Sequence, residues 1–263
     1  MNRFVVTTSH KPTKEQVIIA KNLSEKFGAP YIPRRRLSEL VEKGEVDFYY
    51  VVEANDRLVI RWKGGQFFFH PSVAKVRMKN FQNGGRDYLI EALQLEGSET
   101  VLDATFGLGA EAILMAAFLP HGKVIGLEKS VHIYRIVRHG LQNYKPNAKW
   151  IEHAMKRIEL YNEDMKEFIR KAPDNSYDIV YCDPMFENPK YESSAMNPLR
   201  PFASYDTIDE KDVEEMLRIA RKRVVLKSHE DDTLFERIKA QKIIGSKKSR
   251  VIYGIIEKHV RSF

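Results

Sequence analysis

The chain has 263 residues, of which 43% are hydrophobic and 30% are charged, which is ordinary for a globular protein of one large or two modest domains. No apolar run approaches the ~20 residues needed to span a bilayer, and the first residues show no signal-peptide pattern. Cys182 is the single cysteine, which excludes an internal disulfide and a cysteine-cluster metal site. We therefore expect a cytoplasmic protein with no membrane partner and no bound metal.

The charge is distributed unevenly along the chain. The formal net charge is +7, and residues 1–90 hold 16 Lys and Arg against 9 Asp and Glu, whereas residues 91–263 hold 27 basic and 27 acidic side chains. A basic excess in the first third indicates either a solvated face or a surface that meets phosphates. The candidates for phosphate contact are Arg34, Arg35 and Arg36, and farther along Lys75, Arg77, Lys79 and Arg86.

Residues 1–86 are predicted to form a small basic α/β domain. A short strand is expected at 3–8, and apolar positions at helical spacing predict a helix that begins near Pro12 and ends at Gly28. A proline-bracketed basic loop then carries the three arginines into a short helix. Hairpin-type turns separate three further strands, which should form an antiparallel meander over 47–54, 57–63 and 66–70. We interpret the basic segment 71–86 as a hinge and substrate rim.

Residues 87–263 are predicted to form a second domain. A helix over 87–95 leads into alternating strands and helices, which is typical of a mostly parallel sheet covered on both faces. Strands are expected near 100–104, 123–127, 157–161, 177–182, 222–227, 241–245 and 250–257, and helices near 110–118, 131–142, 164–171, 209–221 and 231–239. A short turn joins the last two strands without a helix, so we expect them to be antiparallel.

An apolar strand that ends at Asp103 runs into the glycine-rich turn 107–109, and a helix begins at Ala110 and Glu111. Glycines at such a turn let the backbone approach a ligand closely. The third glycine of a dinucleotide fingerprint is replaced by Ala112, and an acid at the helix start disfavours a pyrophosphate. The pattern favours a ligand that bears an ammonium and a sulfonium.

Two further acidic residues follow successive strands. Glu128 comes about 20 residues after the glycine turn, where a carboxylate can accept hydrogen bonds from both ribose hydroxyls of an adenosine. Asp164 lies beyond the next strand, where an acid or amide could pair with an adenine amino group. Each residue alone is readily explained as a helix N-cap, but their common placement predicts a nucleoside-containing cofactor.

The turn Asp183-Pro184-Met185-Phe186 closes an apolar strand and offers the chemistry of methyl transfer to an exocyclic amino group. A carboxylate and a backbone carbonyl that accept the hydrogens of an aromatic amine can hold its nitrogen in line with a methyl sulfonium. Pro184 makes the turn rigid, and Phe186 could stack on a base. The alternative interpretation is a capped turn with a buried Phe186.

With these motifs together, the segment 101–257 resembles a class I S-adenosylmethionine-dependent methyltransferase, in which Asp-Pro-Met-Phe is similar to the Asp/Asn-Pro-Pro-Tyr/Phe signature of amino-group methylases. More closely, the chain is similar to the bacterial small-subunit ribosomal RNA guanine-N2 methyltransferase J family. The matching segments are Gly84-Gly85-Arg86, Asp103 to Gly109, Leu127-Glu128-Lys129, Asp183 to Phe186 and Arg223 to Lys227. The chain departs from the family pattern at Ala110-Glu111, Lys129 and Glu187.

The resemblance implies a Rossmann-like, seven-stranded methyltransferase sheet, mostly parallel with the last strand antiparallel, and a small N-terminal α/β domain that recognises RNA. It implies S-adenosylmethionine as cofactor, held by Asp103, Thr105, Gly107, Gly109, Ala110, Glu111, Glu128, Lys129, Asp164, Met165 and Asp183. Asp183, Pro184 and Phe186 would be catalytic. The expected partner is ribosomal RNA or the small ribosomal subunit, and the expected product is a methylated guanine N2.

Three alternatives stay open. The same cofactor could serve methyl transfer to DNA adenine, a protein or a small amine. A nucleotide-dependent oxidoreductase on a similar sheet would bind a nicotinamide cofactor. A non-catalytic RNA-binding module would carry a degenerate pocket, but the intact turn at Asp183 argues against it.

Overall fold

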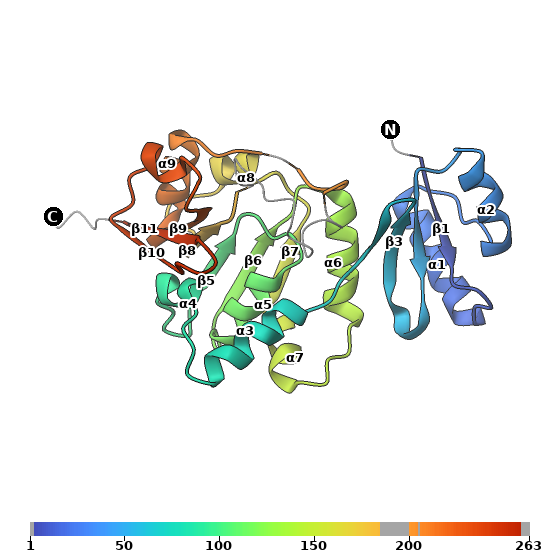
Figure 1. Ribbon diagram of the computed structural model, residues 1–263, viewed down its shortest axis with the longest axis horizontal. Coiled ribbons are helices and arrows are strands. Elements are labelled where there is room, and N and C mark those ends of the chain that lie inside the picture. The colour runs from blue at the N-terminus through green and yellow to red at the C-terminus, as the bar shows by residue number, and fades with distance from the viewer. Residues whose placement is uncertain (1–2, 185–199, 205, 259–263) are drawn as a thin grey trace. The chain divides into compact units, whose positions relative to one another are not determined.

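The computed structural model describes residues 3–184, 200–204 and 206–258. Its contacts divide the chain into two compact units, each built on its own sheet (Figure 1). The first unit comprises residues up to 70 together with 135–145 and 200–201, and the second comprises the rest. Within the described ranges, no helix combines the length and the apolar character needed to cross a bilayer.

The first unit has a four-stranded sheet in the order β1-β2-β3-β4. Its strands are β1 (Phe4–Thr8), β2 (Phe48–Val52), β3 (Leu58–Trp62) and β4 (Gly65–Phe68), and a 3-10 turn, η1 (Ala54–Asp56), joins β2 to β3. β2, β3 and β4 form the predicted antiparallel meander. β1 pairs in parallel with β2, because α1 (Lys14–Phe27) and α2 (Arg34–Glu42) carry the chain back across the sheet.

The predicted first helix is confirmed, and its ends have physical causes. Thr13 and Gln16 form a reciprocal capping box at the start of α1, and Gly28 ends the helix in the left-handed conformation. The loop predicted for the three arginines is wrong. α2 begins at Arg34, directly after Pro33, whose fixed φ suits the position that precedes the first helical turn.

The second unit has the seven-stranded sheet that the sequence predicts, in the order β10-β11-β9-β8-β5-β6-β7 (Figure 1). β5, β6, β7, β8 and β9 are mutually parallel, and β11 runs antiparallel to both β9 and β10. The strands are β5 (Thr100–Asp103), β6 (Lys123–Leu127), β7 (Ile158–Tyr161), β8 (Tyr177–Cys182), β9 (Ala220–His229), β10 (Lys242–Gly245) and β11 (Val251–Glu257).

Helices cover both faces of this sheet. The helices of the second unit are α3 (Ser72–Gln82), α4 (Tyr88–Leu93), α5 (Ala110–Ala117), α7 (Lys149–Met155), α8 (Met165–Lys171), α9 (Glu210–Ile219) and α10 (Leu234–Arg237), and α6 (Val131–Asn143) begins in it. On one face, α8 and α9 bury Ile169 and Met216 against Val180, Val224 and Leu226 of the central strands. Helices α3, α4 and α5 lie on the other face (Figure 1).

Two helices were not predicted. The segment interpreted as a hinge forms α3, whose Ala74 and Met78 are buried and which packs against α5, so residues 71–86 belong to the second unit. Helix α7 is short and begins at Ala148 without a side-chain cap. Neither helix has a capping residue of the Ser, Thr, Asp or Asn type, which is the signal that marks a helix start in a sequence.

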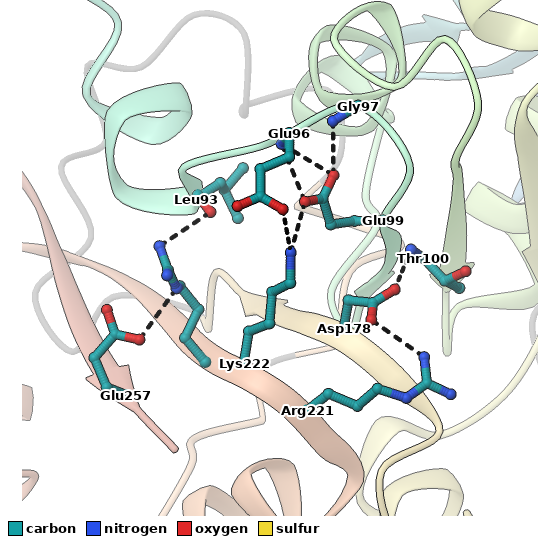
Figure 2. Close-up of polar contacts among 10 residues, drawn as sticks. Leu93, Glu96, Gly97, Glu99, Thr100, Asp178, Arg221, Lys222 and Glu257 are labelled. Carbon is teal, nitrogen blue, oxygen red and sulfur yellow. Dashed lines mark hydrogen bonds and ion pairs between the residues drawn. The ribbon is translucent and has the colours of Figure 1, made fainter. Parts of the chain in front are cut away.

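The amino-terminal edge of the sheet is closed by ion pairs, in which the carboxylate of Glu99 is buried (Figure 2). The carboxylate of Glu99 accepts hydrogen bonds from the backbone N–H groups of Glu96 and Gly97 and from Lys222 Nζ at 3.0 Å. Beside it, Asp178 accepts from the backbone N–H of Thr100 and pairs with Arg221. These contacts fasten the loop before β5 to β8 and β9, and they leave the opposite, carboxyl edge as the place for a ligand.

Candidate active site

The carboxyl ends of β5 and β8 are joined by hydrogen bonds that involve three residues predicted to form the site. Asp103, the last residue of β5, is 1% exposed, and its Oδ1 accepts from the backbone N–H of Thr105 at 3.2 Å. Thr105 Oγ1 in turn accepts from the backbone N–H of Asp183 at 2.6 Å. The glycine-rich turn and Asp183, which follows β8, are therefore linked through Thr105 although 78 residues separate Thr105 from Asp183 in sequence.

The glycine-rich turn is shaped by Phe106. Its ring is buried against Gly126 of β6, where a Cβ would come within 2.0 Å of the ring, and against Gly109, which begins α5 with φ 74°. Side chains at these positions would displace the ring or strain the backbone. Gly107 also has positive φ, but a Cβ there would meet no atom within 4 Å. The turn therefore presents bare backbone to open space at the end of the sheet.

Glu128, directly after β6, is bound to the same turn. Its Oε2 accepts from the backbone N–H of Gly107 at 3.0 Å, and its Oε1 accepts from that of Ser130 at 2.7 Å. The side chain is buried, and burial raises its pKa to about 7, although both backbone donors act in the opposite direction. The carboxylate is thus placed where the sequence predicted a ribose-binding acid.

Asp164, after β7, lies on the same edge and caps α8 through the backbone N–H of Glu167. Lys129 Nζ bridges Asp164 at 2.8 Å and Asp206 at 2.7 Å. Asn162 supports this group because its side-chain amide donates to the carbonyls of Glu128 and Lys129. The ends of β6 and β7 are therefore held together by polar contacts. The amide of Asn162, which the sequence offered together with Asp164 as a partner for adenine, serves this structural link, and sequence reasoning gave no role to Asp206.

Acidic side chains accumulate where β5, β8 and β9 end. Asp183 Oδ2 accepts from Lys227 Nζ at 2.6 Å, and Lys227 also contacts Glu111 of α5 at 3.4 Å. Burial raises the pKa of Asp103 well above its usual value, and the neighbouring carboxylates Glu111, Asp183 and Glu128 raise it further. Burial likewise raises the pKa of Asp183, against the influence of Lys227. A cationic ligand would complement this concentration of negative charge.

The other predicted site residues lie in different surroundings. Pro184 is buried beside Asp183, and Phe186 lies outside the described residues. Ala110 opens α5 next to Glu111, whereas Met165 is buried in the core between the sheet and helices α8 and α9.

The basic residues proposed for RNA fall into both units. Arg35 and Arg36 are exposed on α2, and Arg34 lies over the ring of Tyr49. Lys79 is exposed on α3, Lys75 is half-buried, and Arg86 pairs with Glu91. Arg77 differs from these residues, because its guanidinium is paired with Asp87 and Glu111.

Comparison with known proteins defines the family. Residues 51–255 match the model of the family described as "Putative SAM-dependent methyltransferase". The chain belongs to this family. It is 35% identical over 256 residues to "Uncharacterized protein YpiP" of Bacillus subtilis, a match that covers 96% of this chain and 99% of that protein.

Two further similarities extend the comparison. The Ribosomal RNA small subunit methyltransferase J of Francisella tularensis subsp. novicida is 27% identical over 139 residues, which is 52% of this chain and 56% of that protein. The crystal structure of the SAM-dependent methyltransferase NGO1261 from Neisseria gonorrhoeae superposes with a TM-score of 0.66 at 17% identity and covers 98% of this chain and 97% of that one. The structural likeness confirms the Rossmann-like methyltransferase fold.

The carboxyl edge of this methyltransferase fits S-adenosylmethionine, the cofactor of its family. Gly107 leaves space at the turn, and Glu128 is ready to accept from ribose hydroxyls. The hydroxyl of Tyr181, buried in β8 near Asp103 and Asp183, has no hydrogen-bond partner within the described part of the chain. Asp103 and Glu111 would favour the cationic groups of the ligand. When bound, S-adenosylmethionine supplies an electrophilic methyl group carried by a sulfonium.

Proposed function

We propose that this methyltransferase acts on an exocyclic amino group, and that its substrate is guanine N2 of small-subunit ribosomal RNA. The observation that carries the proposal is the bond between Thr105 Oγ1 and the backbone N–H of Asp183, because it fixes the backbone of Asp183 against the glycine turn. The similarity to a Ribosomal RNA small subunit methyltransferase J and the basic first third of the chain support the choice of RNA.

Asp183 and Pro184 offer the hydrogen-bond acceptors that a weakly nucleophilic aromatic amine needs. The lone pair of an aromatic amine is delocalised into the ring, so the nitrogen must be oriented and pyramidalised before it attacks a methyl group. Asp183 and the carbonyl of Pro184 can accept the two amine hydrogens and hold the nitrogen at the sheet edge. The carboxylate of Asp183 is 26% exposed, so a substrate can reach it although the backbone beneath it is fixed. Phe186 is proposed to stack on the base.

An RNA substrate must present its guanine unpaired, because the amino group at position 2 is engaged in a base-paired helix. The proposed phosphate-binding residues are Arg34, Arg35, Arg36, Lys75, Lys79 and Arg86. Arg77 is left out of this set because two carboxylates already occupy its guanidinium. The proposed contacts would position the RNA backbone, while the pocket at Asp183 would select the base.

The proposal is tested by methyl transfer from radiolabelled S-adenosylmethionine to three acceptors prepared from cells that lack the protein: small ribosomal subunits, naked ribosomal RNA and genomic DNA. We expect label in N2-methylguanosine from subunits or ribosomal RNA. Asp183→Ala should abolish transfer while cofactor binding by calorimetry stays within a few-fold of wild type. Label in DNA adenine, or in none of the three acceptors, would refute the RNA assignment.

The matched control is Asp178→Ala. Asp178 lies at the start of β8, the strand that Asp183 directly follows, and so at the opposite edge of the sheet, where it pairs with Arg221 and the N–H of Thr100 (Figure 2). This change removes a partly buried carboxylate from β8 and should lower stability. It should not reduce transfer in the folded protein. Equal loss of transfer in the two variants would mean that Asp183 acts through stability alone.

A further inference from the structure

Lys227 is a largely buried cation with two carboxylate partners, and it is not among the predicted site residues. Its side chain is 16% exposed, and its Nζ lies 2.6 Å from Asp183 Oδ2 and 3.4 Å from Glu111 Oε1. The sheet creates this contact, because β8 and β9 pair in parallel with Cys182 opposite Leu226. Asp183 directly follows Cys182, and Lys227 directly follows Leu226, so the two residues come to lie side by side. A lysine buried at this depth is costly unless its charge is compensated.

The pair belongs to a longer alternation of charges within the second unit. Glu111 Oε1 also accepts from Arg77 Nη1 at 3.1 Å, and Arg77 makes two parallel bonds of 2.9 Å to the carboxylate of Asp87. The charges of neighbouring side chains thus alternate in sign, from Asp183 after β8 to Asp87 at the N-cap of α4. The series is Asp183, Lys227, Glu111, Arg77 and Asp87. Each cation lies between two anions, so removing one cation leaves buried negative charge without compensation.

The surroundings of Asp183 make it depend on Lys227. The charged or titratable groups that face this pair come from every neighbouring element, and they are Arg77 of α3, Asp103 of β5, Glu111 of α5, Tyr181 of β8 and Tyr253 of β11. Only Arg77 among them is cationic, and it is already bound to two carboxylates. Burial and Glu111 both raise the pKa of Asp183, and Lys227 is the main group that opposes them. Tyr253 lies opposite Lys227 in the register of β11 and β9.

We propose that Lys227 is a positioning residue for methyl transfer, which holds Oδ2 of Asp183, keeps this carboxylate ionised and so leaves Oδ1 to accept a hydrogen of the amine. The inference rests on the proposed role of Asp183 in orienting the amine. It assigns Lys227 no contact with the substrate. If Lys227 served folding alone, replacing it would change neither the protonation of Asp183 nor the rate of methyl transfer in the protein that still folds.

The first test needs no acceptor. The carboxyl carbon of Asp183 is followed by NMR in full-length protein with carbon-13-labelled aspartate, and its signal is identified by its absence in Asp183→Asn. In Lys227→Met we expect this signal to titrate at least one pH unit higher than in wild type. An unchanged titration would overturn the proposal. Because no RNA is present, this outcome is independent of whether ribosomal RNA is the substrate.

The second test measures the rate of transfer to the acceptor found above. In Lys227→Met we expect kcat at pH 7 to fall about 10²-fold with little change in KM, and the acid limb of the pH–rate profile to move upward. Lys227→Arg keeps the charge but not the geometry, so its acid limb should match wild type while kcat is reduced. A displaced acid limb in Lys227→Arg, or a wild-type profile in Lys227→Met, would contradict the proposal.

Lys222→Met is the matched control for both tests. Lys222 lies on the same strand as Lys227 and likewise pairs with two carboxylates, those of Glu96 and Glu99, but it does so at the amino-terminal edge (Figure 2). Its loss should lower stability and leave both the Asp183 titration and the pH–rate profile at wild-type values. If Lys227→Met does not fold, Lys227→Arg and this control still decide the question, because the proposal requires Lys227→Arg to lower kcat without moving the acid limb and Lys222→Met to change neither. An unchanged kcat in Lys227→Arg would overturn the proposal.

Discussion

Glu128, the proposed ribose-binding residue, is subject to two opposing influences in the free protein. It is fixed by two backbone donors, Gly107 and Ser130, and it is buried deeply enough that its pKa rises to about 7. Hydrogen bonds from ribose hydroxyls require the ionised form, whereas burial favours the protonated form. The affinity for S-adenosylmethionine should therefore depend on pH in the physiological range.

The affinity of the wild type for S-adenosylmethionine should increase about 10-fold between pH 6 and pH 8, because the fraction of ionised Glu128 increases through a pKa of about 7. Protonation of Glu128 at low pH competes with binding of the cofactor, so the affinity rises as the pH rises. Glu128→Gln should bind more weakly at pH 8 and lack this increase. Calorimetry on both proteins measures it, and the difference between them cancels the titration of the ligand itself. Parallel pH profiles would contradict the role of Glu128.

The sequence identified the acids of the candidate site but not the partners that control them. Four acids mark the ends of successive parallel strands: Asp103 ends β5, and Glu128, Asp164 and Asp183 follow β6, β7 and β8. Parallel strands bring their carboxyl ends to one edge, so the local pattern was sufficient. Lys227 is 44 residues from Asp183, and their contact depends on β8 lying beside β9 in a particular register. Such a pairing is a property of the sheet, and no periodicity in either segment encodes it.

At the scale of elements, the glycine turn depends on a ring packed against a strand. Phe106 is buried over Gly126 of β6 and also contacts Gly109 at the start of α5. The ring therefore connects β6 to α5 and fixes the backbone between them. This arrangement explains why the turn can hold a fixed shape although it contains two glycines with positive φ.

Gly126→Ala should lower stability by about 1–3 kcal/mol, because its Cβ would overlap the Phe106 ring, and it should also weaken S-adenosylmethionine binding by moving the turn. Gly254→Ala is the matched control, since Gly254 of β11 lies under the ring of Phe235 with a similar overlap. Urea unfolding and calorimetry on both variants separate the two effects. Equal losses of affinity in the two variants would show that the turn is not specifically involved.

The loop before β5 is held by Glu99, whose burial opposes ionisation but whose bonds to Lys222 and to backbone N–H groups lower its pKa to about 2. A lowered pKa contributes stability above pH 4.5 that is lost as the pH falls toward 2. Glu99→Gln should therefore reduce the free energy of unfolding by about 3 kcal/mol at pH 7 and by less at pH 3. Urea titrations at both pH values test this, and a pH-independent difference would contradict it. Cofactor affinity at pH 7 should not change.

Elements with strong local signals were predicted correctly, and those without them were missed. The capping box of α1 and the alternation of strands and helices after residue 100 are visible in the sequence. In α3, three basic residues and the following Asn83-Gly84-Gly85 concealed a helix that is stabilised by packing against α5 and by the pairing of Arg77. Tertiary contacts therefore decided a segment whose composition favoured a linker.

At the scale of the whole molecule, the net charge of +7 favours a polyanionic partner. If the proposed basic residues bind RNA, affinity should fall steeply with salt. Lys75→Ala with Lys79→Ala should weaken binding to ribosomal RNA and reduce the slope of log affinity against log salt by about 0.7 per lost phosphate contact. Filter binding across a salt series measures this slope. Lys247→Ala with Lys248→Ala, which removes two exposed lysines from the turn before β11, should leave the slope unchanged.

The most direct measurement is mass spectrometry of the nucleosides of small-subunit ribosomal RNA from cells that lack the protein, complemented with wild type or with Asp183→Ala. We predict that N2-methylguanosine falls by one residue per subunit in the deletion, returns with wild type, and does not return with an Asp183→Ala protein that is folded and still binds S-adenosylmethionine. An unchanged content of N2-methylguanosine in the deletion, or full restoration by Asp183→Ala, would contradict the account.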